Sequence, residues 1–231
     1  MITCKNPILS GFYPDPSICR VGEWFYLVTS IFAYFPGIPV FRSRNLAQWE
    51  QIGNILTRES QLPLQGCEHN EGIYAPTLRW HKGTFYLITT NVSGGGNFIV
   101  TAKNPQGPWS ESHFLENARG IDPSLFFDED GTCYYIGQRE NSRGGRYNGD
   151  CEIWIQKLDL QTFRLEGEAH PVLYGFQRNA IWPEGPHLYK KKWLLLYFFM
   201  QKVEQRSITV KWWPGVKIFL APMNMQGQIR S

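Results

Sequence analysis

The 231-residue sequence predicts an all-β protein of the β-propeller class, and two observations carry this prediction. Aromatic residues make up 15% of the chain, which also holds 22 glycines and 15 prolines, a composition that suits short strands joined by tight turns. In addition, one pattern of two hairpin strands recurs along the chain roughly every 45 to 60 residues. Four-stranded units at such a period are typical of propellers, in which each blade packs face to face on the next.

The recurring pattern predicts the strands in order. In each of its first three copies, a proline-containing stretch leads into a short strand, a polar turn with glycine and an aromatic-aliphatic strand. These hairpins are expected at 13–30, 74–90 and 121–137. A second pair of strands is expected after each of them, at 39–56, 97–115 and 152–173. A fourth copy begins at residue 182, so the chain holds about three blades and the start of a fourth.

Three acidic residues stand where the innermost strands of three blades begin. Asp15, Asp122 and Glu184 are expected at equivalent positions, whereas the second blade has Ala75 there. The innermost strands of a propeller line its central channel, so the three carboxylates are expected to converge on one pocket. Asp-Pro-Ser is also a common turn opener, and a single copy would favour that structural interpretation. Three acids at one register favour a functional site, because clustered like charges are costly and shift each other's pKa.

Paired carboxylates are the minimal requirement for hydrolysis of a glycosidic bond. One carboxyl must stay protonated to donate to the leaving oxygen, and the other must be ionised. The partly apolar setting of Glu184 beside Trp182 is expected to raise its pKa and suits the general acid. Asp15 is then the base, and Asp122 maintains the proton and the orientation of Glu184.

The segments "FYPDPSICRVGEWFYLVTS", "GIYAPTLRWHKGTFYLITTN", "GIDPSLFF" and "WPEGPHLYK" resemble family 43 glycoside hydrolases of the β-xylosidase and arabinofuranosidase branch. The resemblance extends from residue 6 to about residue 192. It implies a five-bladed propeller, here incomplete, and an inverting enzyme that releases xylose or arabinose from the non-reducing end of xylo-oligosaccharides. It assigns Asp15 as base, Asp122 as pKa modulator and Glu184 as acid. Inversion requires the base and acid carboxyls to lie roughly 6.5–9.5 Å apart.

The resemblance also implies that Phe32 and Tyr74 form walls of the sugar pocket, since aromatic faces suit the apolar side of a pyranose ring. A place in the ordinary blade core is the alternative for both residues. At the level of the whole protein, the alternative is a non-catalytic carbohydrate-binding propeller. A Glu184 substitution separates the two, because an enzyme loses turnover whereas a pure binder keeps its affinity.

Other features restrict the partners and the compartment. The five cysteines are scattered without CxxC spacing and the N-terminus lacks a secretory pattern, so a cytoplasmic protein is expected. The histidines show no metal-ligand spacing, and no cofactor is expected. The apolar run "WLLLYFFM" is much shorter than the roughly 20 residues that span a bilayer. The expected partner is a small oligosaccharide substrate, and binding to nucleic acid or to a membrane is not expected. The sequence does not indicate an oligomeric state.

The pattern of the fourth copy stops at Lys192. A glycine-containing turn and a tyrosine-rich strand are expected after "HLYKK", but the chain continues "KWLLLYFFMQKVEQRSITVKWWPG". Shifted reading frames with permitted codons can encode the expected Asn-Gly-Tyr-Tyr and then a string that resembles the family's next blade. The hypothesis is therefore a partial catalytic domain at 1–191 and an out-of-frame tail without a domain at 192–231. On this hypothesis the chain is a truncated, inactive fragment.

Overall fold

The computed structural model describes residues 5–175, 181–191 and 194–202, with only the backbone course for Lys191 and 194–202. The residues described form β-strands and no α-helix, which confirms the all-β prediction. The first sheet pairs β1 (Ser17–Val21), β2 (Trp24–Val28), β3 (Gly37–Ser43) and β4 (Glu50–Leu56) in that order. The second sheet pairs β5 (Thr77–His81), β6 (Thr84–Asn91), β7 (Gly96–Ala102) and β8 (His113–Phe114). The third sheet pairs β9 (Ile121–Phe127), β10 (Cys133–Glu140), β11 (Cys151–Asp159) and β12 (Arg164–Tyr174).

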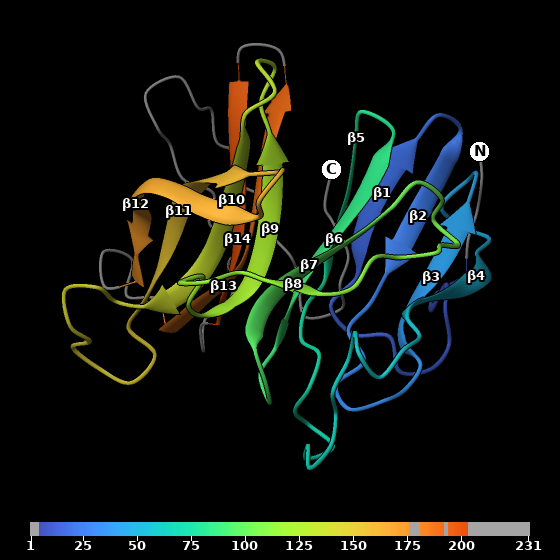
Figure 1. The fold of residues 1–231 in the computed structure, drawn as a ribbon, viewed down its shortest axis with the longest axis horizontal. Coiled ribbons are helices and arrows are strands. Elements are labelled where there is room, and N and C mark those ends of the chain that lie inside the picture. Colours follow the sequence, from blue (N-terminus) through green and yellow to red (C-terminus); the bar gives the residue numbers. More distant parts are fainter. Residues whose placement is uncertain (1–4, 176–180, 192–193, 203–231) are drawn as a thin grey trace. The chain divides into compact units, whose positions relative to one another are not determined.

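Each sheet is an antiparallel meander in which chain neighbours pair, as Figure 1 shows. The three predicted hairpins are present as β1–β2, β5–β6 and β9–β10, and their turns contain the predicted glycines. The predicted second pairs of strands are present as β3–β4, β7–β8 and β11–β12. These four-stranded meanders are the blades that the repeat predicts.

The fourth copy is described as two paired strands, β13 (Ile181–Lys191) and β14 (Leu194–Lys202). Their antiparallel register places Lys191 opposite Leu194 and His187 opposite Phe198. The strand β14 therefore occupies the position of a second blade strand. Residues 203–231 lie outside the described residues, and the out-of-frame origin of 192–231 stays a prediction.

The chain divides into two compact units, 1–116 and 117–231, each with its own core. In the first unit the core joins the first and second sheets; it includes Val28, Ile38, Val40, Leu78, Leu87 and Phe98. In the second unit the core joins the third sheet to β13; it consists of Phe126, Ile136, Ile153, Leu173 and Leu188. Burial of such aliphatic and aromatic side chains is the main force that holds one blade against the next.

The serines of the two Asp-Pro-Ser motifs join neighbouring blades by hydrogen bonds. In the first unit the Leu78 backbone N–H donates to Ser17 Oγ at 3.2 Å. In the second unit the Ser124 hydroxyl donates to the Pro186 carbonyl at 2.6 Å. Both serines are buried, so these bonds satisfy polar groups that water does not reach.

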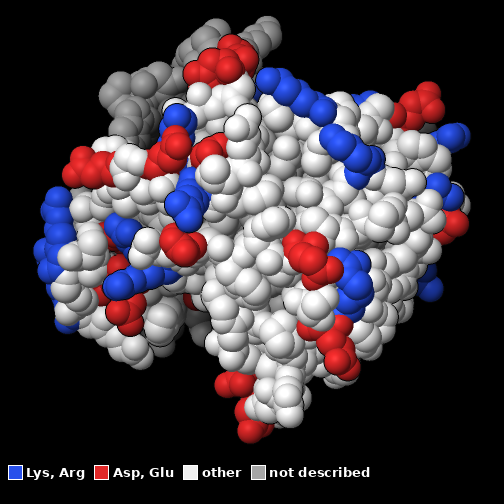
Figure 2. Space-filling model, viewed as in Figure 1, with Lys and Arg blue, Asp and Glu red and all other residues white. Residues whose placement is uncertain are grey.

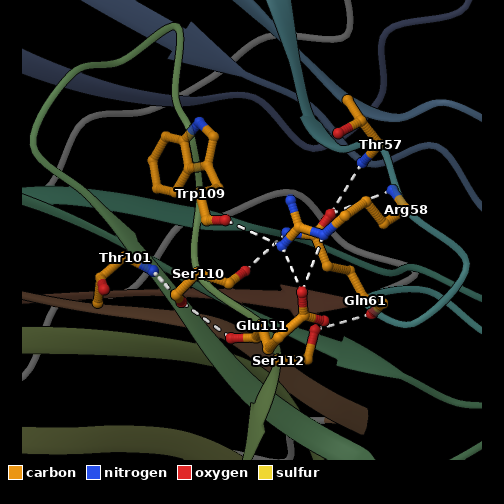
Figure 3. Close-up of polar contacts among 8 residues, drawn as sticks. All are labelled: Thr57, Arg58, Gln61, Thr101, Trp109, Ser110, Glu111 and Ser112. Carbon is orange, nitrogen blue, oxygen red and sulfur yellow. Dashed lines mark hydrogen bonds and ion pairs between the residues drawn. The ribbon is translucent and has the colours of Figure 1, made fainter.

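A buried amide, Gln61, links the loop after β4 to the segment before β8 (Figure 3). Its Oε1 accepts from the backbone N–H groups of Thr57 at 3.0 Å and Arg58 at 3.2 Å. Its Nε2 donates to the Ser110 carbonyl at 2.6 Å, and its backbone carbonyl accepts from the Ser112 hydroxyl at 2.7 Å. One side chain therefore both shapes the loop of the first blade and ties it to the second.

Surface charges are mixed in sign. Beside Gln61, the Arg58 guanidinium contacts Glu111 at 2.7 Å and donates to the Trp109 carbonyl at 3.0 Å. On the first blade Arg42 pairs with Glu50 at 2.9 Å. Figure 2 shows basic and acidic side chains interspersed over the face that it draws. Such exposed pairs each contribute roughly 0–1 kcal/mol, so the cores and the buried hydrogen bonds dominate stability.

Within the part of the chain that the structure describes, no helix is long and apolar enough to cross a membrane.

Replacing Gln61 by glutamate should destabilise the protein. The new carboxylate keeps an acceptor oxygen for the two loop N–H groups but loses the N–H that donates to the Ser110 carbonyl. A buried polar group left without its hydrogen bond costs about 1–3 kcal/mol. Burial raises the pKa of the new carboxyl above its ordinary value of about 4.3. The penalty should therefore shrink as the pH falls through that raised pKa, because the protonated group can donate again.

Urea denaturation at several pH values measures this effect. Gln48→Glu is the matched control, since the Gln48 side chain is exposed. Equal shifts of the unfolding midpoint for the two variants would contradict the role assigned to Gln61.

Candidate active site

The predicted site residues fall into two groups, one in each unit. Asp15, Phe32 and Tyr74 belong to the first unit, whereas Asp122 and Glu184 belong to the second. Within each unit the structure brings its group together. The predicted separation between the Asp15 and Glu184 carboxyls stays a prediction.

Asp15 lies immediately before β1, and its carboxylate is held from one side. The Asp15 Oδ2 accepts from the Ser30 hydroxyl at 2.5 Å, and the Ser30 backbone N–H donates to the Pro14 carbonyl at 3.0 Å. Ser30 is completely buried, whereas Asp15 is exposed. A fixed, buried donor thus orients a carboxylate that solvent or a ligand can reach, as a general base requires.

Asp122 is the second residue of β9 and is half-buried, and its carboxylate reaches β13 in the next blade. Its Oδ2 accepts from the Gly185 backbone N–H at 3.0 Å. Gly185 directly follows the half-buried Glu184 on β13, where the register with β14 shifts between Glu184 and His187. A bulge of this kind re-aims the neighbouring side chains. Asp122 therefore anchors the peptide unit that carries Glu184, which suits the predicted orienting role.

The expected equivalence of the three acids does not extend to the backbone conformation of Glu184. Asp15 with φ 52° and Asp122 with φ 53° are left-handed, and the fourth copy has two such positions, Trp182 with φ 54° and Gly185 with φ 58°. A proline follows each of them. Glu184 lies between Trp182 and Gly185 and does not itself have the left-handed conformation of the two aspartates. The fourth copy reads Trp-Pro-Glu-Gly-Pro where the others read Asp-Pro.

Several acids that sequence analysis did not single out act, together with Glu184, on the buried Cys151 thiol. Burial raises the pKa of the Cys151 thiol to about 11, with the negative charges of Glu184, Glu140, Asp150 and Glu152 adding to the effect. This thiol therefore stays protonated at neutral pH.

One of these acids, Glu152, forms a buried ion pair on β11. It is completely buried and meets Arg139 at 2.7 Å, and the Arg139 guanidinium lies 4.5 Å from the centre of the Trp154 ring. Ser142 adds its backbone N–H at 3.1 Å and its hydroxyl at 2.9 Å to the same carboxylate. No local pattern in the sequence indicates this pairing, because Arg139 and Glu152 meet only across the β10–β11 ladder.

Phe32 and Tyr74 contact each other in the first unit, with ring centroids 5.6 Å apart and planes at 78°. An isolated bridge fixes the Phe32 backbone, which exchanges hydrogen bonds of 2.9 and 3.0 Å with Ile73. Gly72 permits this approach, because a Cβ there would lie 2.6 Å from the Phe32 carbonyl oxygen. Both rings are half-buried and accessible from solvent. Their role as sugar-pocket walls stays a prediction.

Among the described residues, no group of three or more His, Cys, Asp or Glu side chains is placed to hold a metal ion. Asp15, Asp122 and Glu184 supply carboxyl groups, which can transfer protons.

Substitutions at Asp122 should separate the effect of its acceptor oxygen on stability from the effect of its backbone conformation. Asparagine and glycine both adopt left-handed φ values readily, but only asparagine keeps an oxygen for the Gly185 N–H. Asp122→Gly should be less stable than Asp122→Asn by about 1–2 kcal/mol, measured by urea denaturation. Lys82, with φ 45° in an exposed turn, provides the matched control pair Lys82→Asn and Lys82→Gly. If the Asn and Gly variants differ in stability at Asp122 no more than they do at Lys82, the anchoring role would be contradicted.

Comparison with known proteins agrees with this arrangement. The sequence model of glycosyl hydrolases family 43 matches residues 4–206. A protein of Butyrivibrio fibrisolvens named "Xylosidase/arabinosidase" is 63% identical over 193 residues, which are 83% of this chain and 37% of that protein. A non-reducing end alpha-L-arabinofuranosidase of Bacteroides ovatus is 45% identical over 192 residues, 81% of this chain and 34% of its own length.

Among solved structures, the xylan beta-1,4-xylosidase of Bacillus halodurans superimposes with a TM-score of 0.80 at 38% identity, covering 90% of this chain and 41% of that one. The chain spans a little over a third of the length of the curated relatives that it matches. The chain belongs to glycosyl hydrolase family 43, a family of propeller enzymes.

Proposed function

We propose that this chain carries the catalytic residues of an inverting exo-glycosidase that releases xylose or arabinose from the non-reducing end of xylo-oligosaccharides. The observation that carries the proposal is the hydrogen bond from the Gly185 N–H to Asp122, which anchors the peptide of Glu184. The names of the similar proteins support the substrate class, since they include xylosidase and arabinofuranosidase activities. The half-buried aromatic pair Phe32 and Tyr74 supports a sugar site in the first unit.

The proposed roles follow from the chemistry of inversion. Glu184 donates its proton to the glycosidic oxygen as the bond from that oxygen to the anomeric carbon breaks. Asp15 removes a proton from a water whose oxygen bonds to the same carbon from the opposite face. Asp122 positions Glu184 and, by its negative charge, favours the protonated acid. Phe32 and Tyr74 bind the terminal sugar.

We also propose that the 231-residue chain is inactive by itself, since on the out-of-frame hypothesis residues 192–231 supply no blade. The pocket then lacks part of the wall that excludes water and positions the sugar.

A chimera tests the catalytic roles. The 193 aligned residues of this chain replace their counterpart in the Butyrivibrio protein, and xylobiose hydrolysis is followed. Glu184→Gln should lower the rate on xylobiose by about 10²–10⁴-fold, and less on 4-nitrophenyl β-xyloside, whose leaving group needs little protonation. Asp15→Asn should lower both rates alike, because both substrates need an activated water.

An inactive chimera beside an active parent would contradict the proposed function. Equal losses on the two substrates for Glu184→Gln would contradict its role as acid.

The 231-residue chain by itself should show no turnover of 4-nitrophenyl β-xyloside, measured at the protein concentration at which the chimera is active. Turnover comparable to that of the chimera would contradict the proposed inactivity of the chain.

A further inference from the structure

A groove on the first blade lies at the strand ends that are remote from Asp15. The β1–β2 register pairs Ser17, close to Asp15, with Val28, and pairs Val21 with Trp24 at the other end. The groove has a volume of about 270 Å³. It is lined by Trp24 of β2, by the end of β3, by the turn after it and by the start of β4. All of its lining belongs to the first unit, so the groove is complete within that unit.

Two arginine side chains lie on one tryptophan ring in this groove. The guanidinium carbon of Arg44 is 4.4 Å from the centre of the Trp24 ring, and that of Arg42 is 4.8 Å from it. Arg42 also pairs with Glu50 at 2.9 Å. Arg44, in contrast, contacts no carboxylate among the residues that the structure describes. The guanidinium of Arg44 therefore has donors available for a ligand.

The turn that carries Arg44 is fixed by hydrogen bonds. The Ser43 hydroxyl oxygen accepts from the backbone N–H groups of Asn45 at 3.1 Å and Leu46 at 2.9 Å. The Asn45 Oδ1 accepts from the backbone N–H of Gln48 at 2.9 Å. Ser43 is buried, so solvent does not compete for its bonds. Because the Arg44 side chain also lies on a ring, it loses little conformational freedom when it binds a ligand.

The charge of the groove favours a ligand with a single negative charge. Its charged lining side chains are Arg42, Arg44 and Glu50, and Arg42 offsets Glu50. The planar fork of the remaining arginine matches the two oxygens of a carboxylate. A phosphate monoester carries about −1.5 to −2 charges at neutral pH, which would leave excess negative charge beside Glu50. A carboxylate therefore fits the groove better than a phosphate.

The size and the other lining groups of the groove suit a sugar ring. Pockets for drug-sized ligands have volumes of about 300–1,000 Å³, so a groove of about 270 Å³ takes a single ring. The Gln48 side chain offers an amide for sugar hydroxyls, and the half-buried Trp49 offers an aromatic surface for C–H groups.

We infer that this groove is a second carbohydrate site, which binds a uronic acid with its carboxylate on Arg44. The choice of a sugar rests on the proposed function, whereas the choice of a carboxylate rests on the groove. The groove lies at the end of the blade opposite to Asp15, so a sugar acid bound there leaves the candidate catalytic group free. The site thus holds an acidic sugar of an oligosaccharide without taking part in bond cleavage.

Ligand-observed NMR titration of the full 231-residue chain tests this site with D-glucuronate and D-xylose as probes. Arg44→Ala should weaken glucuronate binding by about fivefold or more and leave xylose binding within about twofold. Arg44→Lys keeps the charge but loses the fork, so it should restore only part of the affinity. Added salt should weaken glucuronate binding but not xylose binding, because the groove is open to solvent.

Arg20→Ala is the matched control. The guanidinium carbon of Arg20 lies 5.3 Å from the centre of the Phe25 ring on the same blade. Phe25 follows Trp24 on β2, and adjacent side chains of a strand point to opposite faces, so Arg20 lies outside the groove. Its removal should not change the binding of either sugar. Urea midpoints equal to that of the wild type confirm that each variant is folded.

Several results would overturn the inference. Glucuronate binding that Arg44→Ala leaves unchanged would reject the site. Acetate that binds as tightly as glucuronate, with the same loss in Arg44→Ala, would show an anion site without sugar recognition. An equal loss of glucuronate binding in Phe32→Ala would place the sugar acid at the candidate sugar walls instead.

The same titrations separate this inference from the proposed function. A wild-type chain that binds xylose but not glucuronate would reject the groove and leave the proposed function standing. Within the chimera, Arg44→Ala should hydrolyse xylobiose at the parental rate, and a loss of that activity would contradict the separation of the groove from the catalytic residues.

Discussion

One backbone feature recurs in the fold and among the predicted site residues: a left-handed residue followed by proline near the beginning of the innermost strand of a blade. It occurs at Asp15, Asp122, Trp182 and Gly185, with φ between 52° and 58°. The proline restricts its own φ and removes a backbone donor. The serines that follow the two aspartates then bond to the neighbouring blade. The same few residues thus join the blades and place carboxylates at the strand ends.

In the fourth copy the acid lies beside such a position and not on it. Glycine adopts the left-handed conformation without steric cost, so Gly185 can direct its N–H to Asp122. The acid side chain then stands on Glu184, the adjacent residue, and successive side chains of a strand point to opposite sides. Asp122 therefore acts on the backbone beside Glu184, which makes it a positioning residue in geometry as well as in the proposed chemistry.

Local patterns predicted the parts of the structure that local physics determines. The hairpins follow from glycine turns and from aromatic-aliphatic strands, so their positions were confirmed. The backbone conformation at Glu184, which differs from that of the two aspartates, was missed because the acids were aligned by residue type. The Ser30 bond to Asp15 and the exposure of Phe12 depend on how distant segments pack. No propensity or spacing encodes such contacts.

Each unit holds one group of the predicted site residues, and the two groups have different surroundings. The first unit holds the predicted base Asp15 on the buried hydroxyl of Ser30 and the rings of Phe32 and Tyr74, which on the proposed function serve water activation and sugar binding. The second unit holds the predicted acid Glu184 and Asp122, which anchors the peptide of Glu184. Each group is held by bonds within its own unit and is therefore preorganised there. On the proposed function, sugar affinity should therefore depend on Phe32 and Tyr74, and leaving-group protonation on the bond between Asp122 and the peptide of Glu184.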